Sequence, residues 1–64
     1  TVDYAVAELN RYNRQHIVVA DEALGQERLV GYFRTSDPAR FASAVADMTG
    51  AHVAVRDGDI LLTR

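Results

Sequence analysis

Apolar residues recur at three-and-four spacing near the start of the chain, which predicts an amphipathic helix over residues 2–13. Thr1 can cap the helix, and Asp3 in its first turn complements the positive helix end. The opposite side of the helix is polar and carries Asn10, Arg11 and Arg14. The residues expected to form the buried stripe are Val2, Ala5, Val6, Leu9, Tyr12 and Asn13.

A second helix is predicted from Pro38 to Gly50. Ser36-Asp37-Pro38 places a capping acid directly before a proline, whose missing N–H costs nothing at the first helical position. Gly50 is suited to ending the helix, because glycine readily adopts the left-handed conformation found there. The apolar positions that repeat at helical spacing between these two points are Phe41, Ala44, Val45 and Met48.

Four strands are predicted around these helices. Residues 17–20 form a short run rich in β-branched side chains, typical of a strand covered on both faces. Asp21 then caps a single helical turn that Gly25 is expected to close with a positive φ. Residues 27–34 form the second predicted strand, with Leu29, Gly31 and Phe33 on one face and Arg28, Val30, Tyr32 and Arg34 on the other.

The last two strands are expected to form a hairpin. Residues 52–56 and 59–63 flank Asp57-Gly58, the dipeptide preferred in a two-residue type I′ turn. The pattern therefore indicates an α/β sandwich with helices against one or both faces of small sheets. Residues 1–64 are interpreted as a single domain. Because a helix at residue 2 followed by a strand resembles the back half of a βαβ unit, we expect a first strand upstream and a larger parent polypeptide.

Composition excludes several classes of function. The chain has 64 residues, 25% of them charged, and a formal net charge of −2. Its seven basic residues are all arginines scattered among nine acids, so no basic face for nucleic acid is expected. No apolar run reaches the ~18 residues of a membrane span, so we expect no membrane contact by this part of the protein. Without cysteine, neither a disulfide nor a zinc thiolate site can form.

Candidate chemical groups are few and separated. His16 and His52 have no carboxylate at a metal-ligand spacing, and Asp57-Gly58-Asp59 lacks the further oxygen ligands of a calcium loop. Neither Ser36 nor Ser43 lies in a nucleophile elbow. We therefore predict no catalytic, metal or cofactor site, and interpret the chain as a protein-interaction module.

The residues expected to contact a partner are tyrosine and polar or basic side chains, types that recur in interfaces. Three lie on the polar face of the first helix and three on the second predicted strand, whose edge is expected to be open. They are Asn10, Arg11 and Arg14, followed by Arg28, Tyr32 and Arg34.

An ordered set of short motifs resembles the C-terminal periplasmic region of FecR-type transmembrane sigma-factor regulators. The set begins with the AVAELNRYN sequence of residues 5–13 and continues in IVVAD at 17–21 with Ala23-Leu24. It extends through VGYF at 30–33, Asp37-Pro38 and the closing hairpin. Two departures from the family pattern are Val2, where a proline is common, and the polar stretch at residues 25–28.

This resemblance implies the short domain shared by secretins and TonB-dependent transducers, with two βαβ-type units and two helices packed between small sheets. It implies a periplasmic location, in the C-terminal part of a single-pass inner-membrane protein. The partner would be the N-terminal signalling domain of an outer-membrane TonB-dependent transporter, in the control of iron and siderophore uptake. A sigma factor would be bound only by a cytoplasmic segment absent from these 64 residues.

Three alternatives stay open at this point. The chain could be the signalling domain of the transporter itself, which shares the implied fold. It could also be an N-terminal assembly domain of a secretin, which would form rings or other oligomers. A small-molecule-binding or enzymatic domain would require a pocket with convergent polar groups, and the sequence offers no such cluster.

Overall fold

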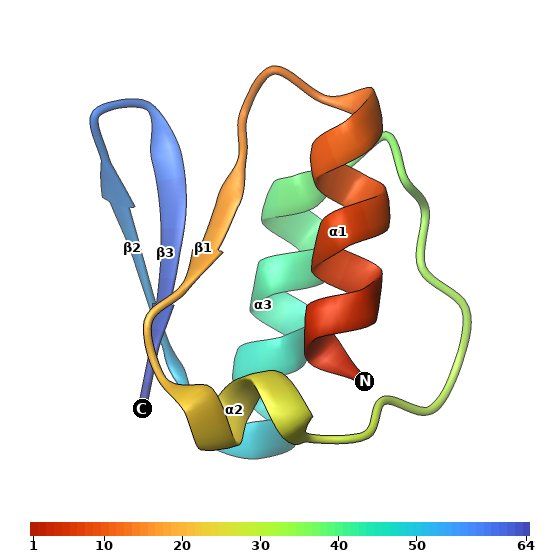
Figure 1. Cartoon of the computed structure of the whole chain (residues 1–64), viewed down its shortest axis with the longest axis vertical. Helices are drawn as coiled ribbons and strands as arrows, with labels where there is room; N and C mark the ends of the chain where they lie inside the picture. Colours follow the sequence, from red (N-terminus) through yellow and green to blue (C-terminus); the bar gives the residue numbers. More distant parts are fainter.

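Three helices and three strands form the chain in a computed structural model that describes all 64 residues (Figure 1). The helices are α1 (Val2–Tyr12), α2 (Glu22–Gln26) and α3 (Pro38–Thr49), and the strands are β1 (Ile17–Val19), β2 (His52–Arg56) and β3 (Asp59–Thr63). The predicted α/β class is confirmed, as are both long helices and the closing hairpin.

The three strands form one mixed sheet in the order β1-β3-β2. β1 runs parallel to β3, with Val18 beside Leu61, and β2 runs antiparallel to β3, with Ala54 beside Leu61. The β2–β3 turn has positive φ angles at Asp57 (53°) and Gly58 (85°), as a type I′ turn requires. The central strand is therefore the last one in the sequence.

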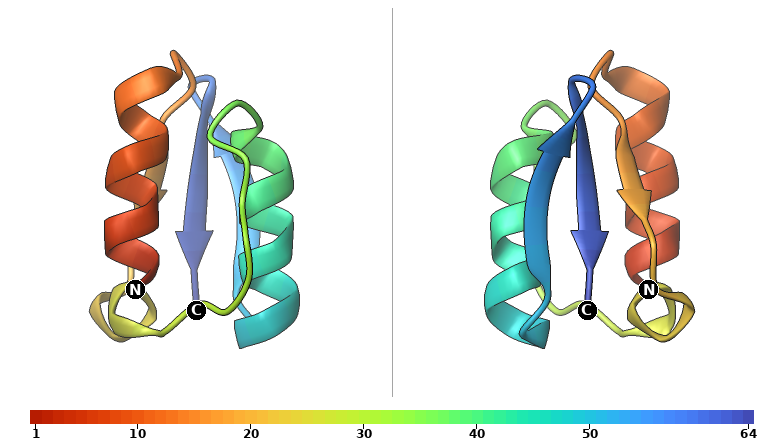
Figure 2. Two further views of the ribbon diagram at one scale, coloured as in Figure 1. Left: turned by 90° about the vertical axis from the view of Figure 1, so that its right-hand side faces the viewer. Right: turned by 90° about the vertical axis from the view of Figure 1, so that its left-hand side faces the viewer.

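Both long helices lie on the same face of this sheet (Figure 2). α1 contacts β1, whereas α3 contacts β3 and β2. The other face of the sheet has no helix over it, and Val18 at the middle of β1 is exposed. The prediction that residues 17–20 are covered on both faces is therefore wrong, because an apolar run of this length does not reveal how many layers cover it.

The core lies between the helices and the sheet and is wholly apolar. Its largest buried side chains are Phe41, Leu24, Ile60, Leu62, Val2 and Val45. Tyr12 and Met48 continue the predicted stripes but are exposed. Both lie in the last turn of a helix, where the stripe extends past the side chains that would cover it.

The helix ends follow the predicted capping chemistry. Thr1, Asp21 and Asp37 each accept a hydrogen bond from the backbone N–H three residues on, at 3.2, 2.8 and 3.1 Å. Gly50 ends α3 with a left-handed φ of 77°. Gly25 differs from the prediction, because it lies inside α2 without a positive φ. A methyl group there would lie 2.5 Å from the Asp3 carboxylate of α1, so a larger residue at this position would require the Asp3 side chain to move.

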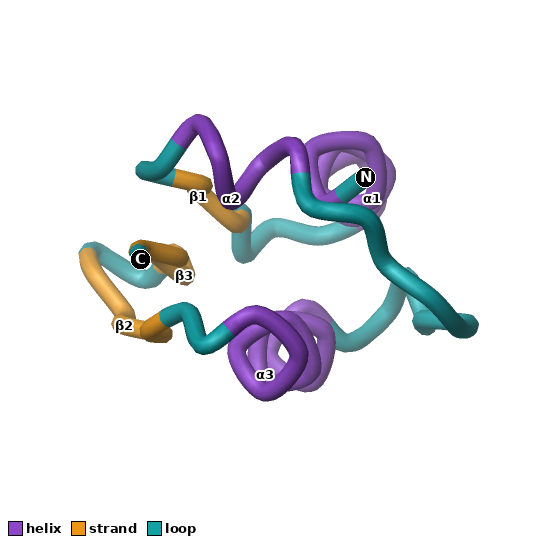
Figure 3. Tube along the Cα trace, turned by 90° about the horizontal axis from the view of Figure 1, so that it is seen from below, coloured by secondary structure: helices purple, strands orange, loops and turns teal.

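The predicted strand at residues 27–34 is not formed. Its residues lie on the far side of the helices from the sheet (Figures 1 and 3), so no strand is beside them to accept their backbone hydrogen bonds. Gly31 also bends the chain there with a φ of 118°. The order of layers is sheet, helices and then this extended stretch, so the helices do lie between two extended layers, of which only one is a sheet.

Candidate partner-binding surface

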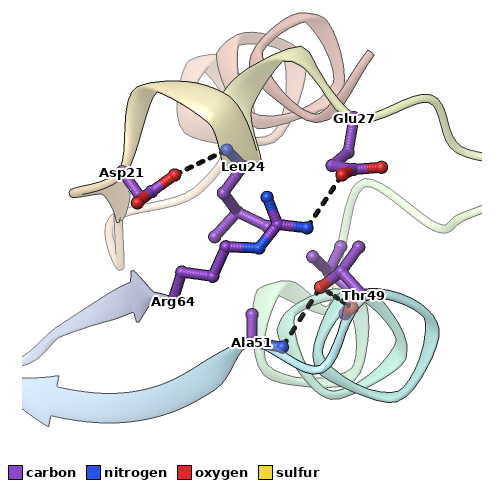
Figure 4. A network of polar contacts seen from close by, with 7 residues as sticks. Asp21, Leu24, Glu27, Thr49, Ala51 and Arg64 are labelled. Carbon is purple, nitrogen blue, oxygen red and sulfur yellow. Dashed lines mark hydrogen bonds and ion pairs between the residues drawn. The ribbon is translucent and has the colours of Figure 1, made fainter.

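We call residues 28–36 the unpaired segment, because none of them makes a backbone–backbone hydrogen bond. The segment is nevertheless held firmly at its start. The Glu27 carbonyl accepts a hydrogen bond from the Val2 N–H at 2.9 Å. The Glu27 carboxylate also pairs with the Arg64 guanidinium at 2.8 Å (Figure 4). Glu27 thus ties the beginning of the segment to both ends of the chain.

The end of the segment is held by Asn13, which directly follows the last residue of α1. The Asn13 Nδ2 donates to the Leu9 carbonyl at 2.8 Å and also to the Thr35 carbonyl. This side chain therefore joins the C-terminal end of α1 to the chain just before α3. The residues next to this link in the sequence are Arg14 and Arg34.

Side chains of the segment alternate between the core and solvent. Leu29 and Phe33 pack against the core, and the Phe33 ring meets Phe41 edge to face with centroids 5.0 Å apart. Val30 is 85% exposed and Tyr32 is fully exposed. The predicted division of faces is thus confirmed at these positions, although the strand itself is absent.

A small hollow lies beside Tyr32, over the inward-facing rings. Its volume is about 270 Å³, and its apolar lining includes Phe33 and Ala44, whereas Phe41 lines it with almost no exposed surface. Polar groups of Arg34, Asp37 and Arg40 line the rest, with Arg40 and Asp37 3.9 Å apart as an exposed ion pair. The hollow offers a partner side chain an apolar floor beside an arginine.

The three predicted residues of the segment are all exposed, as is Val30, and we call these four residues the outward row. Arg28 and Arg34 are exposed and make no ion pair, and Tyr32 lies between them. The row carries no acidic side chain. Neither Arg28 nor Arg34 has an acid of the chain within ion-pair distance, so both guanidinium groups are free to pair with carboxylates of a partner.

The predicted residues of α1 differ from one another. Arg11 is exposed and lies 4.0 Å from Glu8, at the limit of an ion pair. Arg14 is exposed and makes no ion pair. Asn10 instead faces inward, where its Oδ1 accepts from the Ile17 N–H at 2.8 Å and its Nδ2 donates to the Ile17 carbonyl at 3.0 Å. Both polar atoms of Asn10 are used in joining α1 to β1.

Sequence reasoning missed the structural use of the two asparagines. Asn10 and Asn13 lie near the end of α1, directly before a tight connection to β1. Asparagine side chains readily bond backbone groups at helix ends and turns, so the paired asparagines were the available signal. Spacing alone placed Asn10 on the polar side of the helix, and it could not show that the chain folds back onto that side.

No other arrangement in the molecule points to chemistry. No three histidine, aspartate or glutamate side chains gather where they could bind a metal ion. Every buried side-chain nitrogen or oxygen has a hydrogen-bond partner. None of the three helices has the length and apolar content needed to cross a membrane.

Comparison with known proteins identifies no family for this chain. No protein-family model, no curated protein and no solved structure matches the chain. Function is therefore inferred from the residues, the fold and the sequence resemblance.

Proposed function

We propose that this chain is the periplasmic signal-receiving domain of a FecR-type sigma-factor regulator. Its partner would be the N-terminal signalling domain of an outer-membrane TonB-dependent transporter, in cell-surface signalling that controls iron uptake. The sequence resemblance supports the family, and the α/β fold with helices between extended layers is compatible with it. In this proposal the chain binds a protein partner and does not turn over any small molecule. Any sigma factor is held by another part of the regulator.

The observation that carries the binding role is the outward row of the unpaired segment. Tyrosine and arginine are the side chains that most often dominate binding energy in interfaces. Here Tyr32 is fully exposed, and Arg28 and Arg34 flank it without ion pairs. Because Glu27 and Asn13 hold both ends of the segment, the row is presented in a defined position and little ordering should be needed on binding.

Arg11, in the last turn of α1, and Arg14, just beyond it, extend the same surface in this proposal. Asn13 bonds to the carbonyl of Thr35, so the chain beside Arg14 lies next to the chain beside Arg34. Arg14 and Arg34 are both exposed and neither makes an ion pair. A partner surface rich in acidic side chains fits these arginines best, because unlike charges steer association and fix orientation.

Charge reversal tests this proposal. We expect Arg34→Glu and Arg11→Glu each to weaken binding to the signalling domain by more than about 1 kcal/mol, because interface arginines often contribute that much. The signalling domain would come from the transporter encoded beside the gene, and isothermal titration calorimetry would give the affinities.

Arg56→Glu is the matched control for these variants. Arg56 is also exposed and without an ion pair, but it lies on β2, on the other side of the helices. Its reversal should leave the affinity unchanged. Equal losses in all three variants would indicate a general charge effect, and no loss at either Arg11 or Arg34 would remove this surface from the interface.

A further inference from the structure

The sheet has two open edges, and they are unequal. The order β1-β3-β2 leaves β1 and β2 without a neighbour on their outer sides. β1 has three residues, whereas β2 has five and every one of them is exposed. β2 is therefore the longer and more accessible site for adding a strand.

The backbone groups of Val53 and Val55 point away from the sheet. A two-residue hairpin turn is closed by a hydrogen-bonded pair, here Arg56 and Asp59, and such pairs then alternate along the ladder. The pairs that lie between these hydrogen-bonded pairs are Val55 with Ile60 and Val53 with Leu62, and their backbone groups point away from each other. The Ile60 N–H indeed donates to His16 and the Leu62 carbonyl accepts from Ala20, both at 2.9 Å and both on the β1 side. Two N–H groups and two carbonyls on β2 are thus free.

The same two valines leave apolar surface uncovered. They lie on the helix-facing side of the sheet with Ile60 and Leu62, yet Val53 is 42% and Val55 69% exposed. Natural edge strands are usually protected by charged side chains, proline, a bulge, or a covering helix or loop. β2 has the sequence HVAVR and pairs with β3 without a break in register, so it contains no proline and no bulge, and its one charged side chain, Arg56, lies at its end.

The charge on the opposite side of β2 determines what fits. Arg56 lies on the outer face of the sheet and makes no ion pair. Its cross-strand neighbour Asp59 uses Oδ1 to accept the His16 N–H at 3.0 Å. A carboxylate on an added strand, opposite Arg56, would give a favourable cross-strand pair.

A second copy of this chain fits the edge less well. Two β2 strands paired antiparallel, with Val53 opposite Val55 of the second copy, would place Arg56 opposite His52 of that copy. Neither of these positions offers an acid, so the second copy would add no carboxylate opposite Arg56. The residues of β2 thus favour a different strand over self-pairing.

We propose that the β2 edge binds an extended strand from another protein, paired antiparallel and carrying acids at both ends of an apolar centre. Opposite Arg56, Val55, Ala54, Val53 and His52, the pattern is acid, apolar, small, apolar, acid. The apolar pair would cover the two valines on the helix-facing side, and the four free backbone groups would gain partners. This inference goes beyond the proposed signalling role, because it concerns another surface and does not depend on that role.

The test uses the 64-residue chain labelled with ¹⁵N and the peptide acetyl-Gly-Glu-Val-Thr-Val-Glu-Gly-amide. We expect saturable shifts on β2 and slowed hydrogen exchange at the Val53 and Val55 amides, with little change at the Ala54 amide, which already bonds to β3. A control peptide with arginine in place of both glutamates should bind at least fivefold more weakly. Equal binding of the two peptides, or no binding of either, would overturn the proposal.

Two variants separate strand addition from other modes. Val55→Pro removes an outward N–H without removing a hydrogen bond to β3, so binding should be lost, whereas Val55→Thr should retain it. Arg56→Glu should reverse the preference and favour the arginine peptide, which keeps the test decisive if the proline variant does not fold. The proposal would be contradicted if Val55→Pro retained binding or if Arg56→Glu left the peptide preference unchanged. It would also be contradicted by concentration-dependent shifts on β2 without peptide, because these indicate self-pairing.

Discussion

The β-sheet and the unpaired segment have similar side-chain patterns but different backbone environments. In β3, Ile60 and Leu62 face the core while Leu61 between them lies on the outer face. In the segment, Leu29 and Phe33 face the core while Val30 and Tyr32 face solvent. β3 has a strand on each side, whereas the segment has none.

The difference shows that alternation predicts which side chains are buried but does not predict that a sheet forms. A strand needs a neighbour to satisfy its backbone groups, and that neighbour is a property of the whole fold. The segment keeps its position through side-chain packing and two anchored ends. Its exposed row is consequently available to a partner, whereas Ile17, Ile60 and Leu62 of the sheet are buried in the core.

The largest effect should come from the central strand. Leu62→Ala removes a fully buried side chain from β3 and should lower the free energy of unfolding by about 3 kcal/mol, within the usual range for such truncations. Urea denaturation followed by circular dichroism would measure the change. Leu61→Ala, one residue earlier and on the outer face, should cost less than half as much. Equal costs would contradict the one-sided burial of the sheet.

A smaller loss is expected where α1 joins the sheet. Asn10→Ala removes two hydrogen bonds to Ile17 and leaves both backbone groups without that partner, which should cost about 2 kcal/mol. Arg11→Ala, on the exposed side of the same helix, should change stability by no more than about 0.5 kcal/mol. If Asn10→Ala were as mild as Arg11→Ala in thermal denaturation, Asn10 would not have the structural role described.

The unpaired segment should contribute least to stability. Phe33→Ala should cost about 1 to 2 kcal/mol, because the ring is only partly buried against Phe41, and Tyr32→Ala should be within about 0.5 kcal/mol of the parent chain. Hydrogen exchange would show slow amides in β3 and fast ones at residues 28–36 in the parent chain. Amides in the segment as slow as those of β3 would contradict the absence of backbone partners.

Local chemistry in the sequence predicted much of the fold. Asp37-Pro38 and Gly50 defined α3, Asp57-Gly58 defined the hairpin, and Thr1 defined the start of α1, because caps and turns depend on residues close in sequence. The strand predicted at residues 27–34 was wrong for the opposite reason. Its formation depends on a neighbour that no local pattern reveals.

The candidate surface was predicted in part for the same reason. Exposure of Arg28, Tyr32 and Arg34 follows from alternation, and exposure of Arg11 and Arg14 from helical spacing. The inward role of Asn10 and the link from Asn13 to Thr35 depend on how the chain returns after α1. Long-range contacts of this kind decide whether a polar residue binds a partner or holds the fold.

The most direct test of the proposed role is a titration of the ¹⁵N-labelled chain with the signalling domain of the transporter encoded beside its gene. We predict saturable chemical-shift changes concentrated at residues 28–36 and at the C-terminal end of α1, with β2 unaffected. A folded chain that shows no shifts, or shifts confined to the sheet, would contradict the claim that the unpaired segment receives the signalling partner.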